Sequence, residues 1–311
     1  MEHAQIKTVS IFGAGAMGAS YASMFYNMDR ECVHFVAAGN RYEQLKKKGI
    51  IVNGMLYTIP VITPDENNKP ADDLVIVAVK YHHLPQTIKE MKNRVAGNTI
   101  IISVMNGIDS EELIGTAFGM NKVVYAIVLG IDAVRNENSV VYTTQGKIYF
   151  GEAKNAVFSE KVNRVKSYFD GAGIMYEIPE DMIRIIWWKF MINVGINQAS
   201  AAMKAPYSEF QTSPSAKNLM ESAMREVIHI AKAEGIKLSD NDTAKWHQVL
   251  SGLSPSGKTS MLQDVEAGRK TEVEMFAGKV LELGKKYGIS TPVNEKLFKM
   301  IKEFERNGFK R

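Results

Sequence analysis

The sequence has a single cysteine, few prolines and almost no excess of charge of either sign. Its one cysteine, Cys32, excludes an internal disulfide and any zinc site built from several cysteines. The 38 lysines and arginines exceed the 34 aspartates and glutamates by only four, and their even spread argues against nucleic acid as a partner. With 45% hydrophobic and 23% charged residues, the 311-residue chain has a globular composition and room for two domains.

Long hydrophobic runs are also missing. The most apolar stretch, residues 182–196, is interrupted by Arg184, Lys189 and Asn193, so it does not predict a membrane span. The residues before the first expected strand are too few and too polar for a signal peptide. We therefore expect a soluble, cytoplasmic protein that has no membrane partner.

Short apolar runs alternate with helical patterns in the first half of the chain. Runs that are apolar on both faces are typical of a parallel sheet covered by helices on both sides. The expected strands are residues 8–12, 31–37, 74–79, 99–104, 123–129, 140–143, 147–151 and 174–178. This pattern predicts an α/β Rossmann-type dinucleotide-binding domain over residues 1–180.

After Pro179 only helical periodicity is visible. The expected helices are residues 181–203, 215–234, 240–250, 271–287 and 292–305. Thr271 and Glu274 have the spacing of a capping box, and Thr291-Pro292 marks the start of the last helix. We predict an all-α domain over residues 181–311 that supplies the substrate and catalytic groups.

A glycine-rich motif joins the first expected strand to a helix. It reads Gly13-Ala14-Gly15-Ala16-Met17-Gly18, a G-x-G-x-x-G pattern. Gly13 allows the tight turn, Gly15 lets a pyrophosphate approach the backbone, and Gly18 lets the helix pack close to the sheet. A purely structural glycine turn is the alternative, but the position at the first strand-to-helix junction favours dinucleotide binding through all six residues.

The end of the second expected strand lacks the acid that reads the ribose of NAD. Ala38 stands near the place where that acid is expected, and Arg41 is the nearest candidate to bind a 2′-phosphate. We therefore expect NADP as the cofactor, with NAD as the possible alternative. Arg41 as an ordinary surface residue at a helix start remains open.

Lys189, Asn193 and Asn197 are spaced by four and share one face of the expected helix 181–203. The rest of this helix is apolar nearly all round, so it is expected to be buried. A buried lysine costs several kcal/mol unless it is paired or opens on a cleft. A snorkelling lysine beside two structural asparagines is the alternative, but three aligned polar side chains favour a substrate site.

Other polar residues are candidates by position. Lys80 and Asn106 follow two expected strands, at the sheet edge where open α/β sheets bind ligands. Ser260 and Glu272 could approach the same cleft, although spacing alone does not show it. No histidine pair has metal-ligand spacing, so we expect no metal site.

Taken together, these segments resemble the 2-dehydropantoate 2-reductase (ketopantoate reductase) family. The resemblance runs through the glycine motif, Lys80, Asn106-Gly107, Trp187-x-Lys189-x-x-x-Asn193-x-x-x-Asn197, Ser260-Met261-Leu262-Gln263-Asp264 and Thr271-Glu272. It implies a Rossmann domain and a helical domain with the active site between them. It also implies reduction of 2-dehydropantoate to pantoate by NADPH, for pantothenate and coenzyme A synthesis.

The resemblance further implies a role for each site residue. Lys189 is the general acid, and Ser260 holds the substrate carboxylate. Asn193 and Asn197 bind substrate, and Glu272 binds near the nicotinamide or the substrate. Lys80 and Asn106 contact the cofactor.

Two positions depart from the family pattern. Ala38 replaces the usual arginine for the 2′-phosphate, and Gly257 replaces a substrate-binding asparagine of some members. A dehydrogenase for another 2-oxo or β-hydroxy acid is therefore an alternative, and a non-catalytic dinucleotide sensor is a second one. The apolar helical domain makes a homodimer plausible.

Overall fold

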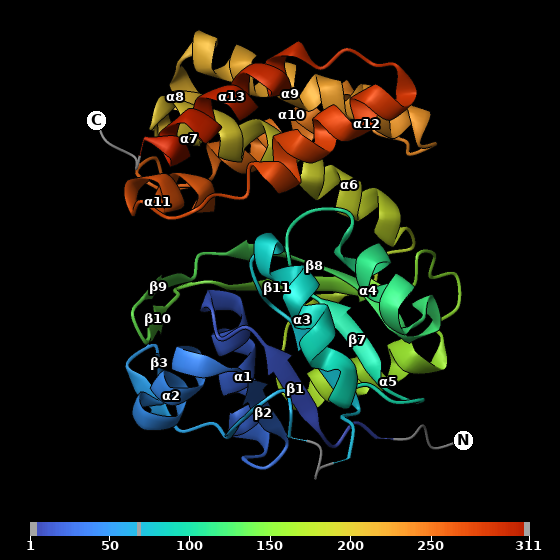
Figure 1. Cartoon of the computed structure of the whole chain (residues 1–311). Coiled ribbons are helices and arrows are strands. Elements are labelled where there is room, and N and C mark those ends of the chain that lie inside the picture. The colour runs from blue at the N-terminus through green and yellow to red at the C-terminus, as the bar shows by residue number, and fades with distance from the viewer. Residues whose placement is uncertain (1–4, 67–69, 308–311) are drawn as a thin grey trace. The chain divides into compact units, whose positions relative to one another are not determined.

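The computed structural model describes residues 5–66 and 70–307, so part of the segment judged not to be a signal peptide lies outside the described residues. The chain divides into two compact units, Met1–Met182 and Ile183–Arg311 (Figure 1). We call them unit 1 and unit 2 and describe each separately.

Within the described residues, unit 1 contains an eight-stranded sheet in the order β12-β11-β8-β7-β6-β1-β2-β5. Its strands are β1 (Val9–Phe12), β2 (Val33–Val36), β5 (Val61–Ile62), β6 (Leu74–Val77), β7 (Ile100–Ser103), β8 (Val123–Ile131), β11 (Gln145–Gly151) and β12 (Tyr176–Glu177). Neighbouring strands are parallel except β8 and β11. The predicted α/β Rossmann-type fold is thus confirmed, with one antiparallel pair that the apolar runs did not reveal.

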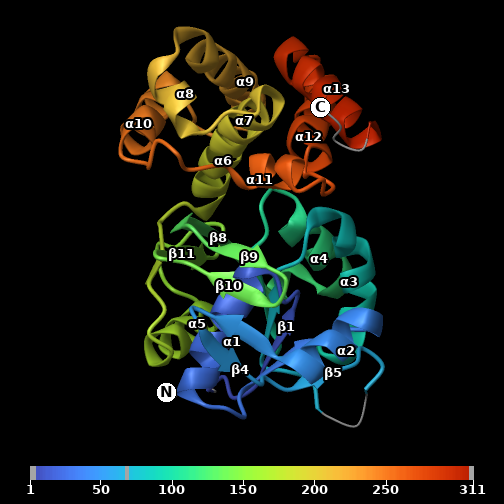
Figure 2. The ribbon, with the colours of Figure 1, turned by 90° about the vertical axis from the view of Figure 1, so that its left-hand side faces the viewer.

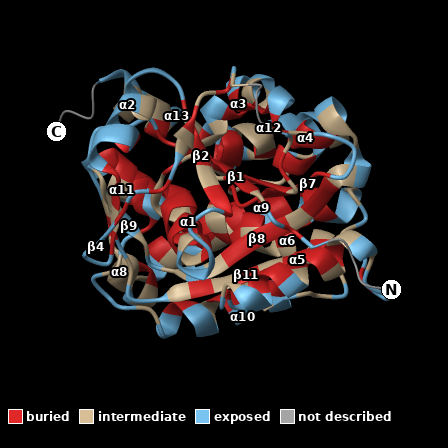
Figure 3. Ribbon diagram, turned by 90° about the horizontal axis from the view of Figure 1, so that it is seen from below, coloured by how far each residue is buried: buried red, intermediate tan, exposed pale blue. Residues whose placement is uncertain are grey.

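Helices cover both faces of this sheet. They are α1 (Ala16–Met28), α2 (Gly39–Lys48), α3 (Leu84–Glu90), α4 (Ser110–Phe118) and α5 (Glu160–Gly171). Successive strand residues point to opposite faces, so Ile11 joins one apolar core with Phe25 while Phe12 joins the other with Leu84. The central strands are buried throughout (Figure 3).

A small second sheet packs against α1 (Figure 2). Its order within the described residues is β4-β3-β10-β9, from β3 (Ile50–Val52), β4 (Met55–Tyr57), β9 (Val134–Asn136) and β10 (Ser139–Val141). The expected strand 140–143 belongs here and not to the main sheet. The other strands are too short to leave a periodic signal, so the sequence did not predict them.

Unit 2 contains helices and no strand over residues 183–307. These are α6 (Met182–Ile192), α7 (Gln198–Met203), α8 (Tyr207–Thr212), α9 (Pro214–Ala233), α10 (Asp240–Ser251), α11 (Ser260–Glu266), α12 (Lys279–Tyr287) and α13 (Pro292–Arg306). The predicted all-α character is confirmed. Two expected helices differ in detail, because π-helical turns at Asn193–Asn197 and Glu274–Gly278 precede α7 and α12.

Candidate active site

The glycine motif turns between β1 and α1 at the carboxyl edge of the main sheet. A Cβ at Gly13, where φ is +102°, would lie 2.4 Å from the carbonyl oxygen of Ala78, and one at Gly18 would lie 1.9 Å from that of Gly13. Neither approach is possible for another residue. At Gly15 the nearest atom to an added Cβ is 3.9 Å away, so the space beside this glycine is open.

The amino end of α1 has the properties of an anion site. Gly15 is its N-cap, no side chain caps it, and no acidic residue stands in its first turn. Ala16 and Met17 begin the helix and are only partly buried. The first N–H groups of a helix lack intrahelical acceptors and carry partial positive charge, so they suit a phosphate. The turn therefore fits a dinucleotide.

Two arginines reach the same carbonyl of this turn. Arg41 Nη2 on α2 and Arg135 Nη1 on β9 each donate to Ala14 O at 2.5 Å. Burial lowers the pKa of Arg41, and burial together with the charge of Arg41 lowers the pKa of Arg135 to about 10. Sequence reasoning placed Arg41 near the turn but missed Arg135, because no local pattern signals that the short β9 brings Arg135 to the glycine turn.

Lys80 and Asn106 lie at the same edge of the sheet as the turn. Val77 of β6 pairs with both Phe12 of β1 and Ser103 of β7. Lys80 and Asn106 each follow their strand's last residue by three positions, and both are partly buried. The glycine turn, Lys80 and Asn106 therefore follow three neighbouring parallel strands, β1, β6 and β7, at the same edge of the sheet.

A buried polar network lies beneath the Asn106 loop. Ser103 Oγ and Ser110 Oγ are 2.8 Å apart, and Ser110 Oγ donates to Glu111 Oε2 at 2.8 Å. Glu111 is 4% exposed, and burial raises its pKa to about 7. Sequence reasoning missed this network, because a single glutamate in a helical pattern reads as a surface residue.

In unit 2, Lys189 lies near the end of α6, and the π turn Asn193–Asn197 follows directly. Lys189 and Asn193 are partly buried, Asn197 is buried, and Asn197 Nδ2 lies 3.4 Å from Asn193 Oδ1. Each residue of a π turn advances by a smaller angle than in an α-helix. The four-residue step from Asn193 to Asn197 therefore offsets the drift accumulated from Lys189, and the three side chains stay on one face.

The π turn depends on close packing and on one buried amide. A Cβ at Gly195 would lie 2.5 Å from the Met224 side chain of α9, so only glycine allows this contact. Gln198 Nε2 donates to Val194 O at 2.7 Å, and Gln198 Oε1 accepts from the backbone N–H of Ala277 at 3.0 Å. Gln198 thereby links both π turns.

Ser260 begins α11 in unit 2, and Glu272 follows this helix in the chain. Ser260 is exposed at the first position of α11, a helix that packs against α7 and the first π turn. Glu272 is 8% exposed, next to Thr271, whose Oγ1 donates to Glu305 at 2.7 Å. The predicted Thr271–Glu274 capping box is wrong, because Glu274 pairs with Lys302 at 2.8 Å instead.

Gly257 lies under the ring of Tyr207. A Cβ at Gly257 would lie 2.9 Å from Tyr207 Cδ2, and Tyr207 N donates to Gly257 O at 3.0 Å. An asparagine at position 257 would require Tyr207 to move. Glycine at position 257, which departs from the family pattern, therefore allows the close approach of Tyr207.

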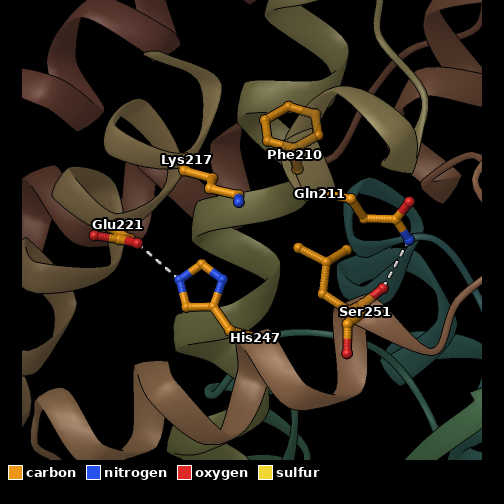
Figure 4. Close-up of a pocket in the computed structure, with 7 residues that line it drawn as sticks. Phe210, Gln211, Lys217, Glu221, His247 and Ser251 are labelled. Carbon is orange, nitrogen blue, oxygen red and sulfur yellow. Dashed lines mark hydrogen bonds and ion pairs between the residues drawn. The ribbon is translucent and has the colours of Figure 1, made fainter. Parts of the chain in front are cut away.

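A separate pocket of about 360 Å³ lies among α8, α9 and α10 (Figure 4). It is lined by Phe210, Gln211, Lys217, Glu221, His247, Leu250 and Ser251. His247 Nε2 lies 2.7 Å from Glu221 Oε1. None of the site residues expected from the sequence lines it.

Among residues 5–66 and 70–307, no group of three or more His, Cys, Asp or Glu could hold a metal ion. No helix formed by them has the length and apolarity needed to cross a bilayer. Cys32 is buried and accepts a hydrogen bond from Tyr168 Oη at 3.1 Å.

Two family models match the chain. "Ketopantoate reductase PanE/ApbA" matches residues 9–155, and "Ketopantoate reductase PanE/ApbA C terminal" matches residues 181–305. The 2-dehydropantoate 2-reductase of Aquifex aeolicus is 28% identical over 302 residues, covering 95% of this chain and 96% of that protein.

Solved structures share the whole fold. D-mandelate dehydrogenase, solved with NADH and anilino(oxo)acetate, has a TM-score of 0.89 at 20% identity and covers 98% of this chain and 100% of its own. A dimeric ketopantoate reductase from Staphylococcus aureus has a TM-score of 0.78 at 20% identity, covering 97% and 99%. At these identities the likeness concerns the fold alone.

Proposed function

The chain belongs to the ketopantoate reductase family, and from this premise we propose that it reduces 2-dehydropantoate to pantoate with NADPH. Its activity is that of an NAD(P)-dependent oxidoreductase acting on a small 2-oxo acid. Membership in a family of reductases disfavours a non-catalytic sensor.

The observation that carries the proposal is the polar face of Lys189, Asn193 and Asn197. These side chains lie on a mostly apolar, largely buried helix, and a π turn keeps them aligned. π turns inside α-helices occur frequently at functional sites. A helix that served packing alone would gain nothing from this arrangement.

Unit 1 supplies the residues that would hold the cofactor. Gly13 and Gly18 form the turn, Gly15 leaves open space, and the uncapped end of α1 would receive the pyrophosphate. Lys80 and Asn106, which follow β6 and β7, would contact the cofactor. When bound, the reduced nicotinamide supplies the hydride.

Unit 2 supplies the acid and the substrate contacts. Lys189 donates a proton to the ketone oxygen and stabilises its developing negative charge. Asn193 and Asn197 hold the ketone end through amide N–H groups, and the Ser260 hydroxyl donates to the substrate carboxylate. Glu272 orients the substrate near the nicotinamide.

The test is NADPH oxidation by the purified protein with 2-dehydropantoate and a panel of other 2-oxo acids. We expect the highest kcat/KM for 2-dehydropantoate, with pantoate as the product. Activity with none of these acids would reject the proposal.

A second candidate is reduction of a different 2-oxo or β-hydroxy acid, and the Gly257–Tyr207 contact favours it. Tyr207 occupies the space beside position 257, where an asparagine would otherwise stand. A higher kcat/KM for another acid of the panel would support this candidate over pantoate formation.

For assembly and cellular location, we expect a cytoplasmic homodimer with no nucleic-acid or membrane partner. The dimeric S. aureus reductase of the same fold and the one buried, unpaired cysteine support this expectation. Light scattering during gel filtration measures the mass directly.

A further inference from the structure

Two like-charged side chains converge on one backbone atom. Arg41 and Arg135 both donate to Ala14 O, at 2.5 Å each, from α2 and β9. The two residues are 94 positions apart in the sequence, with Arg41 on helix α2 and Arg135 on strand β9 of the small sheet. A single carbonyl dipole offsets little of their combined charge.

Neither guanidinium has a carboxylate partner among the residues that the structure describes. Arg135 Nε donates to Glu137 O at 2.8 Å, which is a backbone oxygen. Both side chains are half-buried. Two partly desolvated positive charges repel each other, so the arrangement is costly unless an anion joins them.

Donor groups remain for that anion. A guanidinium has five N–H groups, and the contacts above use one in Arg41 and two in Arg135. The pair lines a pocket of about 310 Å³ together with Lys48 and Glu137. Arginine forks suit the oxygens of a phosphate because several N–H groups can bind at once.

The position of the pair selects which phosphate it binds. Arg41 lies just after the end of β2, where a Rossmann fold reads the 2′ position of the adenosine ribose. The pyrophosphate would instead lie at the end of α1, beside the open space at Gly15. We propose that Arg41 and Arg135 together bind the 2′-phosphate of NADPH, with Arg135 as a second specificity-determining residue.

This inference rests on the proposed function for its cofactor. It explains how the chain selects NADPH although Ala38 replaces the usual arginine. Arg135 takes over the role of the arginine missing at position 38, because strand β9 of the small sheet brings it to the glycine turn. The selection therefore depends on a segment outside the strand-helix-strand unit that holds the motif.

Direct binding of two fragments tests the inference without turnover. Adenosine 2′,5′-bisphosphate and adenosine 5′-monophosphate differ only in the 2′-phosphate, and isothermal titration calorimetry measures both Kd values. We expect the wild type to bind the bisphosphate at least about tenfold more tightly, from added charge-assisted hydrogen bonds.

Variants separate the two arginines from general charge. Arg135→Gln should weaken bisphosphate binding by roughly ten- to a hundredfold and 5′-monophosphate binding by less than about threefold. Arg41→Gln should act in the same way. Arg30→Gln is the control, since Arg30 is an exposed arginine of unit 1 that lies over the Tyr26 ring. It should change neither Kd.

Other outcomes overturn the inference. Equal weakening of both fragments in Arg135→Gln would assign the arginine to the shared 5′-phosphate, and no weakening would assign it a structural role. Arg135→Lys retains the charge without the fork and should give an intermediate loss, which keeps the test valid if the glutamine variant unfolds.

Reductase activity with NADH and no preference for the bisphosphate would reject this inference alone. Preference for the bisphosphate without reduction of any 2-oxo acid would reject the proposed function alone.

Discussion

The backbone N–H of Ala277 donates to the side-chain oxygen of Gln198 at 3.0 Å, across 79 positions of the sequence. The same side chain donates to Val194 O at 2.7 Å. One fully buried amide thus satisfies a backbone group of each π turn. The first turn carries Asn193 and Asn197, and the second follows Glu272, so Gln198 positions two parts of the proposed substrate site.

Replacing Gln198 tests this link. Gln198→Ala removes three buried hydrogen bonds, to Val194 O, Asn294 Oδ1 and Ala277 N, so we expect a loss of roughly 2–4 kcal/mol in the free energy of unfolding. We also expect a higher KM for the 2-oxo acid. Gln211→Ala is the matched control, because Gln211 Nε2 bonds Leu250 O and Leu253 O, each at 2.9 Å, away from the site. A stability loss without any KM change in Gln198→Ala would limit this residue to a structural role.

Lys189 is the proposed proton donor. Lys189→Ala should lower kcat by roughly 10²–10⁴-fold, the range typical of a positioned acid. Lys189→Arg should not restore it, because a guanidinium keeps its proton. The Kd of NADPH, measured by fluorescence, should hardly change, since the glycine motif lies in unit 1. Lys217→Ala, a half-buried lysine on α9, is the control. Near-normal turnover in Lys189→Ala would contradict this role and favour the alternative of a snorkelling lysine.

Asn197 and Ser260 are proposed to bind the ketone and carboxylate ends of the substrate. Asn197→Ala and Ser260→Ala should each raise KM by about tenfold with a smaller effect on kcat, because the lost bonds act in ground and transition states alike. Asn218→Ala, an exposed asparagine on α9, should leave both constants unchanged. Unchanged KM in both site variants would place the substrate elsewhere.

Two glycines of the motif, Gly18 and Gly15, should differ in their effects on folding and on cofactor binding. Gly18→Ala places a Cβ 1.9 Å from Gly13 O, so it should cost roughly 3 kcal/mol of stability. Gly15→Ala meets only an atom 3.9 Å away and should change stability by about 1 kcal/mol or less, while raising the Kd of NADPH at least about tenfold. Thermal unfolding and fluorescence titration measure the two effects. Tight NADPH binding by Gly15→Ala would contradict the placement of the pyrophosphate.

Glu111 gives the stability a defined pH dependence. Burial raises its pKa from 4.5 to about 7, so the folded chain keeps a proton that the unfolded chain releases. Stability should therefore fall as pH rises from about 4.5 to about 7, by roughly 3 kcal/mol at most, and stay level above. Glu111→Gln should remove this part of the dependence in urea unfolding at pH 5 and pH 8. Glu112→Gln, its exposed neighbour, should keep it.

Local chemistry made several elements predictable from the sequence. Apolar runs such as residues 74–79 and 99–104 correspond to β6 and β7, because a strand buried on both faces has no polar position. The glycine spacing identified a turn whose close contacts tolerate no side chain at Gly13 or Gly18. Thr291-Pro292 marked the start of α13, since proline fits the first helical turn.

Contacts between distant segments were not predictable, because they leave no local pattern. The amino end of α13 is bonded by Glu226 of α9, through Val293 N at 2.8 Å and Asn294 N at 3.0 Å. Arg135 reaches Ala14 because β10 pairs with both β3 and β9. The π turn at Asn193–Asn197 requires the approach of Met224 to Gly195 and the bond from Gln198. Residue type and spacing thus predicted the kinds of groups in the proposed site, while packing between distant elements set the alignment of Asn193 and Asn197 and brought Arg135 to Ala14.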